Sequence, residues 1–154
     1  MNKRTLSNLG FLIAIVGVFI GLKLYMGRHA ELPAYFDASR TLQDALAASE
    51  VSGKPVLAVV SADWCPSCQG FKRGALSDAE VSGWISQNTE PVYIDVTSGN
   101  NPDAAVLSVR FIPAVVLMKA DGELARVEGA MSASKFLGWA NKTLAEAPSV
   151  TIPD

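Results

Sequence analysis

Thiol and imidazole side chains are scarce in this chain, which has two cysteines, Cys65 and Cys68, and one histidine, His29. A structural zinc site needs four ligands, usually Cys or His side chains, so we expect no metal held within the chain. A stabilising disulfide framework needs several cysteines at distant positions, and a bridge over two intervening residues removes little entropy from the unfolded chain. The two cysteines suit a redox centre or, because soft thiolates bind Cu(I), a two-coordinate copper site.

Clustered basic residues are also missing from most of the chain. Four of the thirteen basic residues precede residue 30, whereas all fifteen acidic residues follow it, which leaves a formal charge of about −6 on the remainder. Affinity for nucleic acid needs clustered Lys and Arg, so we expect no nucleic-acid partner. The 154 residues contain no internal repeats, and at 49% hydrophobic they have enough apolar side chains for the core of one domain.

Charged residues are absent from residues 9–22, whose sequence is LGFLIAIVGVFIGL. The apolar run resumes after Lys23, and residues 9–26 as a helix would extend roughly 27 Å, most of the thickness of a hydrocarbon core. A lysine near the end of such a helix can extend its ammonium group to the lipid headgroups. We therefore expect a short basic N-terminus at residues 1–8 and a transmembrane signal anchor at residues 9–26.

A cleaved signal peptide is the alternative for this segment. Ala30 is the small residue that would precede the cleavage site, but the large Arg28 occupies the minus-three position. This favours an uncleaved anchor. Gly17 and Gly21 form a GxxxG pair that is able to pack two helices together, but glycine is common in membrane helices and we do not expect a homodimer.

Helix and strand patterns alternate through residues 39–147, which we expect to be the folded domain. The expected elements are a helix at 39–50, a strand at 56–61, helices at 65–73 and 78–87, a strand at 91–96, a helix at 102–109, strands at 114–118 and 123–127, and a helix at 132–147. Residues 27–38 would be a tether and residues 148–154 a tail.

Local motifs support these boundaries. Thr41 with Asp44, and Ser77 with Glu80, have the spacing of capping boxes that begin helices, and the dipeptide at residues 121–122, Asp-Gly, predicts a hairpin turn. The first strands must pair in parallel through helical crossovers, whereas the hairpin is antiparallel. We predict an α/β fold with a mixed sheet of four to five strands and helices on both faces.

The C-x-x-C motif follows a buried strand and begins a helix, a position that favours redox chemistry. Cys65 in the first turn would lie beside unpaired backbone N–H groups at the positive end of the helix dipole, and both favour the nucleophilic thiolate. Cys68 would lie deeper on the same side and would resolve a mixed disulfide on Cys65. Pro66 is tolerated at a helix start. Ser67 can donate a hydrogen bond near the thiolate, and Trp64 can form a flat wall beside the sulfur or simply pack in the core.

At these residues the chain resembles the thioredoxin superfamily, through ADWCPSC at residues 62–68 and RFIP at residues 110–113. The resemblance implies a thioredoxin-like fold, a cis peptide bond before Pro113, and packing of the Ile112-Pro113 loop near Cys65. A proline that opens a strand is the alternative role for Pro113. The segment after Cys68, CQGFKRGALSDAEV, is similar to the corresponding segment in the C-terminal domain of DsbD, a bacterial membrane electron carrier.

Two features depart from the thioredoxin pattern. Val59 occupies the position of a buried aspartate that helps to move the proton of the second thiol, and no lysine is found on the next strand near Pro91. Asp63 is a candidate for a weaker proton acceptor, although we expect it to be a solvated loop residue. These departures leave the rate and the redox potential open.

The expected function is that of a membrane-anchored thiol–disulfide oxidoreductase. It would lie in the bacterial inner membrane as a single-pass protein, with its C-terminal domain in the periplasm. Its partners would be disulfide-bearing proteins and a membrane or periplasmic electron donor, and its one redox group the Cys65–Cys68 disulfide, without a cofactor. The absence of histidine between the cysteines and the DsbD-like segment favour reduction or electron relay. The alternatives are a disulfide oxidase or isomerase, a copper-delivery module, and a scaffold that retains only the fold.

Overall fold

Strand β1, Val56–Ser61, lies at the centre of the sheet because its apolar and β-branched side chains are buried on both faces. The structure, a computed structural model, describes residues 3–26 and 29–147. Within these residues the sheet has four strands in the order β2-β1-β3-β4. The other strands are β2 Glu90–Asp95, β3 Ala114–Lys119 and β4 Gly122–Glu128.

The sheet is mixed, as the sequence predicts. Strand β1 is parallel to β2 and antiparallel to β3, and β3 is antiparallel to β4. The hairpin between β3 and β4 turns one residue earlier than expected, because Lys119 pairs with Gly122 and the turn consists of Ala120 and Asp121. Gly122 has a φ of 148°, a conformation that glycine adopts most readily.

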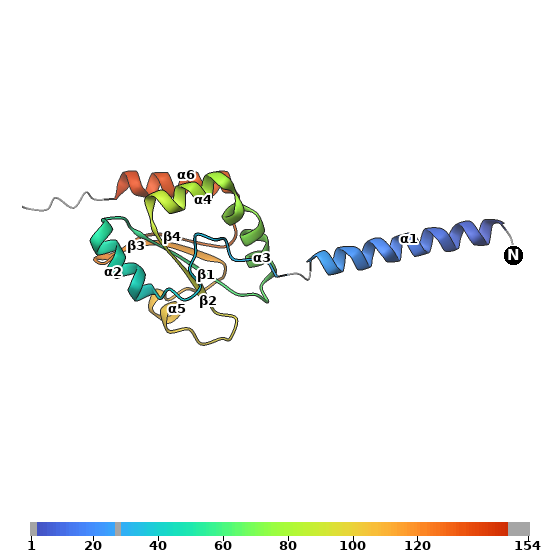
Figure 1. The fold of residues 1–154 in the computed structure, drawn as a ribbon, viewed down its shortest axis with the longest axis horizontal. Helices are drawn as coiled ribbons and strands as arrows, with labels where there is room; N and C mark the ends of the chain where they lie inside the picture. The colour runs from blue at the N-terminus through green and yellow to red at the C-terminus, as the bar shows by residue number, and fades with distance from the viewer. Residues whose placement is uncertain (1–2, 27–28, 148–154) are drawn as a thin grey trace, which may run out of the picture.

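Helices cover both faces of the sheet (Figure 1). One face packs against α3, α4 and α6, and the other packs against α2 and α5. The bounds are α2 Leu42–Ser52, α3 Pro66–Arg73, the 3-10 helix η1 Ala75–Ser77, α4 Ala79–Asn88, α5 Pro102–Leu107 and α6 Ala133–Glu146. The α/β class with helices on both faces is thereby confirmed.

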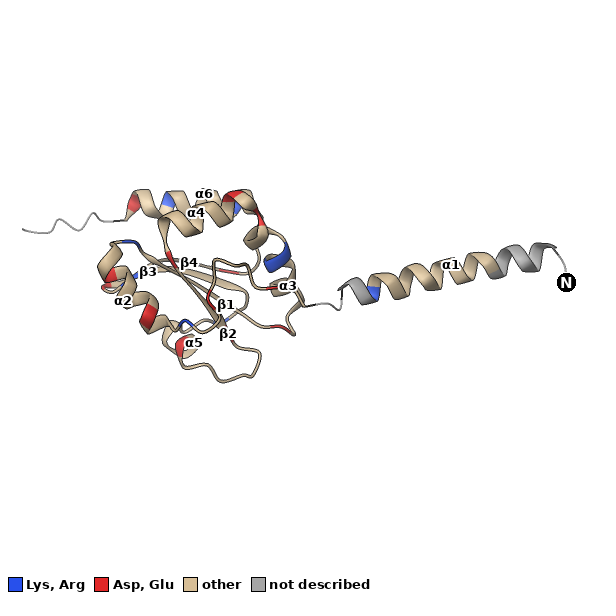
Figure 2. Ribbon diagram, viewed as in Figure 1, with Lys and Arg blue, Asp and Glu red and all other residues tan. Residues whose placement is uncertain are grey.

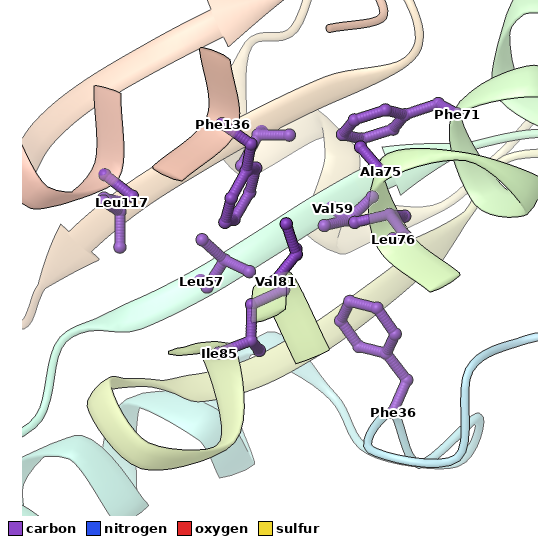
Figure 3. Packing of buried hydrophobic residues seen from close by; sticks show 12 residues of the cluster. Phe36, Leu57, Val59, Phe71, Ala75, Leu76, Val81, Ile85, Leu117 and Phe136 are labelled. Atoms are coloured by element: carbon purple, nitrogen blue, oxygen red, sulfur yellow. The ribbon is translucent and has the colours of Figure 1, made fainter. Parts of the chain in front are cut away.

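The core consists of two layers because successive side chains of a strand point to opposite faces. Leu57 and Val59 of β1 belong to the layer beneath α3, α4 and α6, where Phe136 of α6 is fully buried (Figure 3). Val56 and Val60 belong to the opposite layer. The strand that leads to the cysteine motif is thus held rigidly from both sides.

One of the two predicted capping boxes is present. The hydroxyl of Thr41 accepts from the backbone N–H of Asp44, whose carboxylate accepts from the backbone N–H of Thr41, and α2 begins there. The second box was wrong by one residue, because Asp78 caps α4. Ser77 belongs to η1 instead, and its hydroxyl donates to the carbonyl of Lys72 over 2.6 Å.

The segment at residues 29–40, expected in part as a tether, packs against the domain. Phe36 is only 5% exposed and belongs to the core layer beneath α3 (Figure 3). The hydroxyl of Tyr35 donates to the carbonyl of Leu76 over 2.7 Å, and the backbone N–H of Ala30 donates to Gln69 Oε1 over 2.5 Å. This segment therefore fastens the N-terminal side of the domain to α3 and η1.

Helix α1, Lys3–Met26, precedes the domain. Its described side chains, Gly10 to Lys23, are all exposed, and Lys23 is the charged one among them (Figure 2). In the part of the chain that the structure describes, no helix combines the length and the apolarity that a membrane crossing requires. Residues 1–2, 27–28 and 148–154, which include parts of the predicted N-terminus and tether and the whole predicted tail, lie outside the described residues.

Candidate active site at the start of helix α3

Cys65 is the N-cap residue of α3, and Cys68 lies in the first turn. The two cysteines form a disulfide, with their Cα atoms 5.2 Å apart. The backbone N–H of Cys68 donates to Cys65 Sγ over 3.2 Å, so the sulfur caps the helix as a Ser or Asp oxygen would. Pro66 occupies the first helical position, where its missing N–H costs no hydrogen bond.

The two sulfur atoms differ in their access to solvent. Cys65 is 6% exposed, whereas Cys68 is fully buried beneath it. Both pack with Ala62, and partly buried Val96 and Ile112 close the cluster. An incoming disulfide can therefore reach Cys65 first, while Cys68 is placed to react only within the protein.

The loop before β3 lies against Cys65. The Ile112–Pro113 peptide bond is cis, the isomer expected from the sequence. The carbonyl oxygen of Ile112 lies 3.9 Å from Cys65 Sγ. Pro113 is buried just before the start of β3, and its carbonyl accepts from the backbone N–H of Gly129 over 2.7 Å. The structure thus brings together two motifs that are separated by more than forty residues in the sequence.

Ser67 and Trp64 lie beside the cysteines at the surface. Ser67 Oγ is 3.2 Å from Cys65 Sγ, close enough to donate a hydrogen bond to a thiolate there. The indole ring of Trp64 is 65% exposed, so core packing is not its role. Its Nε1–H donates to the carbonyl of Thr97 over 3.2 Å, which fixes the ring at the edge of the site.

Thr97 is a supporting residue that the sequence did not reveal. Its hydroxyl accepts from the backbone N–H of Asp63 over 2.8 Å, and it donates in turn to the carboxylate of Asp95. These bonds join the loop after β2 to the loop that precedes Cys65. A threonine two residues after a strand has no distinctive pattern, so only the tertiary structure identifies it.

Lys72 is the second residue that sequence analysis missed. It lies one turn after Cys68 on α3, and its side chain is only 4% exposed. Its Nζ lies 3.0 Å from Asp63 Oδ1 and 5.5 Å from the centre of the Tyr93 ring. Asp63, expected to be solvated, is 41% exposed but ion-paired. The hydrogen bond from Lys72 holds the pKa of Asp63 below its ordinary value.

Val59 is fully buried and pairs with Tyr93 on β2 and with Val115 on β3. The position at which thioredoxins have a buried acid is therefore apolar here, and β2 has no lysine. Among the residues whose burial is described, the buried lysine is Lys72 of α3. Among the described residues, no group of three or more His, Cys, Asp or Glu side chains is arranged to hold a metal ion.

Comparison with known proteins places this geometry in a family. A family model described as a thioredoxin-like domain matches residues 42–144. The thiol:disulfide interchange protein DsbD of Yersinia enterocolitica is 37% identical over 102 residues, which cover 62% of this chain and 17% of DsbD. DsbD of Yersinia pestis is 34% identical over 109 residues, which cover 67% of this chain and 18% of DsbD. The chain thus spans less than a fifth of the length of these relatives.

Solved structures show the same fold. The reduced form of the Neisseria meningitidis DsbD C-terminal domain superposes with a TM-score of 0.56 at 28% identity, covering 70% of this chain and 98% of that domain. A thioredoxin from Thermus thermophilus superposes with a TM-score of 0.59 at 24% identity, covering 69% of this chain and 85% of that protein, and supports the fold alone. The DsbD matches, together with the Cys65–Cys68 pair, support thiol–disulfide oxidoreductase activity, and the family model shows that the chain belongs to the thioredoxin-like family.

Proposed function

We propose that this protein reduces, or relays electrons to, disulfides of extracytoplasmic partner proteins through Cys65 and Cys68. The proposal rests on the difference in exposure and surroundings between the two cysteines. Cys65 is the more exposed sulfur, caps α3 and lies against the Ile112-Pro113 loop, whereas Cys68 is fully buried. A nucleophile that faces the partner and a resolving thiol that faces the interior are what dithiol exchange requires.

The proposed reaction begins with the reduced protein. The thiolate of Cys65 attacks one sulfur of the partner disulfide, so that a Cys65–partner bond forms and the other partner sulfur leaves as a thiolate. Cys68 then loses its proton to solvent and attacks Cys65 Sγ, which releases the second partner sulfur. Two electrons pass to the partner, its two thiolates take up protons, and the Cys65–Cys68 disulfide remains.

The start of α3 stabilises the attacking thiolate. The N–H of Cys68 already points at Cys65 Sγ, and Ser67 Oγ lies within hydrogen-bonding distance of the same sulfur. Hydrogen bonds to the charged form and the positive end of the helix dipole both favour that form. The backbone carbonyl of Ile112 marks where the partner's main chain would approach.

Two observations favour reduction over oxidation. The two DsbD proteins described above, which the chain resembles, are named as thiol:disulfide interchange proteins, a name that fits electron relay. Pro66 and Ser67 provide no histidine between the cysteines, and a histidine there would stabilise the thiolate of an oxidant. The oxidised protein then requires a membrane or periplasmic dithiol protein as electron donor.

The proposal also places the domain in the periplasm, anchored to the inner membrane by residues 9–26. In its support, residues Phe11 to Leu22 of α1 are exposed and none of them is charged. Extraction of cell membranes with carbonate at high pH tests this part separately. Retention of the chain in the membrane pellet is expected, and its release into the supernatant would contradict the anchor.

Cys68→Ser tests the reaction itself, because it allows attack by Cys65 but prevents release. Purification of this variant from cells should yield mixed disulfides with partner proteins, whereas the matched Cys65→Ser variant should yield none. Failure to find any adduct through Cys65 would count against disulfide exchange. Tight stoichiometric Cu(I) binding with negligible disulfide reduction would instead favour copper delivery.

A further inference from the structure

A buried lysine next to the redox motif is the most unusual feature of the site. Lysine side chains are almost never fully buried unless they are paired, yet Lys72 is only 4% exposed. It follows Cys68 by four residues on α3, so the two side chains lie on the same face of the helix, with their Cβ atoms about 5–6 Å apart. The exchange reaction proposed above makes no use of this charge.

Asp63 compensates the charge of Lys72. The Nζ–Oδ1 distance is 3.0 Å, and Gln69 Nε2 lies 3.4 Å from the same carboxylate oxygen. Burial works against the charged form of Lys72, but the hydrogen bond to Asp63 and the neighbouring groups outweigh it, and its pKa lies above the ordinary value. The pair therefore remains ionised at neutral pH.

Other polar groups face the pair from strand β2 and from the N-terminal segment. The aromatic ring of Tyr93 on β2 lies beneath the ammonium group, with its centre 5.5 Å from Nζ. His29 from the N-terminal segment and Asp95 at the end of β2 line the same cleft of about 410 Å³ as Asp63 and Lys72. The cleft keeps the carboxylate of Asp63 partly solvated, while the ammonium of Lys72 is enclosed.

The two charges bracket the cysteine motif. Asp63 precedes Cys65 by two residues, and Lys72 follows Cys68 by one helical turn. Val59, on the neighbouring strand, supplies no charge of its own. A single charge within several ångströms of a thiol shifts the balance between thiol and thiolate, whereas two opposite charges in contact largely cancel at a distance.

We propose that Lys72 and Asp63 form a charge-balanced ion pair, in which each charge prevents the other from shifting the thiolate stability and reduction potential of the Cys65–Cys68 dithiol. Each residue acts through the other and touches neither the partner nor the reacting sulfurs, so both are positioning residues. The inference rests on the proposed dithiol function. It predicts that removal of one charge leaves the other unbalanced, so that the two removals shift the thiolate stability of Cys65 in opposite directions.

The test measures alkylation of the reduced full-length protein in detergent by iodoacetamide across pH. Lys72→Met leaves the Asp63 carboxylate unbalanced and should raise the pH midpoint of Cys65 alkylation by about half a unit, a roughly threefold loss of thiolate. Asp63→Asn leaves the ammonium unbalanced and should lower the midpoint by a similar amount. The double variant should return close to the native midpoint, and Lys72→Arg should retain it.

The reduction potential gives an independent measurement of the same effect. Equilibration with glutathione above both alkylation midpoints should make Lys72→Met more reducing and Asp63→Asn less reducing, each by roughly 15 mV for a threefold change in the equilibrium constant. Lys142→Met is the matched control, because Lys142 pairs with Glu146 at the exposed surface of α6, with side chains 73% and 68% exposed. It removes one solvent-exposed positive charge from a different helix and should shift neither quantity.

Shifts of the same sign in the two single variants, or no shift in variants that still fold cooperatively, would show that the pair is only structural and would overturn the inference. A double variant whose midpoint stays clearly shifted from the native value would do the same. The reduction of a model protein disulfide by the native chain, with Cys65→Ser as the negative control, tests the proposed function separately. If the native chain does not reduce the model disulfide, the proposed function is wrong, but the alkylation midpoints can still be measured. Failure of the function and failure of the ion-pair inference are therefore distinguishable.

Discussion

The backbone N–H of Cys68 donates a hydrogen bond to Cys65 Sγ over 3.2 Å. In the proposed reaction, the helix that buries Cys68 would therefore stabilise a thiolate at Cys65. Because Cys65 and Cys68 are three residues apart, this one hydrogen bond at the start of α3 involves both cysteines of the proposed exchange reaction.

Ser67→Ala removes the hydroxyl that lies 3.2 Å from Cys65 Sγ. A single hydrogen bond of this kind contributes about 1 kcal/mol, so disulfide reduction at neutral pH should slow by roughly two- to tenfold, with little change in the urea midpoint. Stopped-flow reduction of a model protein disulfide measures the rate. Ser86→Ala, at an exposed position of α4, is the control. An equal loss of rate in that variant would show that the hydroxyl of Ser67 does not act on Cys65.

Trp64→Ala should affect partner binding more than stability. The ring is 65% exposed, so its loss should raise KM several-fold while the free energy of unfolding changes by less than about 1 kcal/mol. Trp84→Ala should instead affect stability more than partner binding, because Trp84 packs edge-on against Phe136 and donates to Asn141 Oδ1 over 2.7 Å. It should destabilise the domain by about 3 kcal/mol. Urea unfolding measures the stability of both variants, and steady-state kinetics measures their KM. An unchanged KM for Trp64→Ala would contradict a role of the ring in partner binding.

Phe36→Ala tests whether the N-terminal segment is part of the domain. Phe36 is 5% exposed beneath α3, so truncation should cost about 3 kcal/mol of unfolding free energy through lost burial and a new cavity. The matched variant Phe111→Ala removes the same group from a site that is 69% exposed and should cost less than about 1 kcal/mol. Equal stabilities in chemical denaturation would mean that residues 29–40 are a free tether.

Glu90 should contribute to the acid sensitivity of the fold. The hydrogen bond from Arg40, over 2.7 Å, lowers the pKa of Glu90 below its unfolded value. A carboxylate with a lowered native pKa stabilises the fold above its unfolded pKa of about 4.3, and this contribution is lost as pH falls through the native pKa. Glu90→Gln should therefore be less stable by about 1 kcal/mol at pH 7 and should lose less stability on acidification.

Urea titrations of the native chain and Glu90→Gln at several pH values between 7 and 3 measure this difference. The two curves of stability against pH should converge on the acidic side, where Glu90 is protonated in both states of the native chain. A constant separation between them would show that Arg40 acts on Glu90 through packing and not through its charge.

Periodicity and local motifs predicted the order of helices and strands because these depend on neighbouring residues. The capping box at Thr41 and Asp44 is present, and strand 56–61 is buried on both faces as its β-branched composition indicates. The second capping box failed by one residue because Ser77 is drawn into η1 by its bond to the carbonyl of Lys72. That competition depends on how α3 ends, which local spacing does not describe.

Dithiol exchange could be predicted from the residues alone, because a cysteine pair at a strand-to-helix junction and an Ile-Pro dipeptide later in the chain are local patterns. Which groups surround the sulfurs depends on the tertiary structure. Lys72 resembles any helical lysine until the fold encloses it between Asp63 and Tyr93, and Thr97 resembles any loop threonine until it joins two loops. Burial and charge pairing depend on residues far apart in the chain, so the surroundings of the two sulfurs form only when the chain folds.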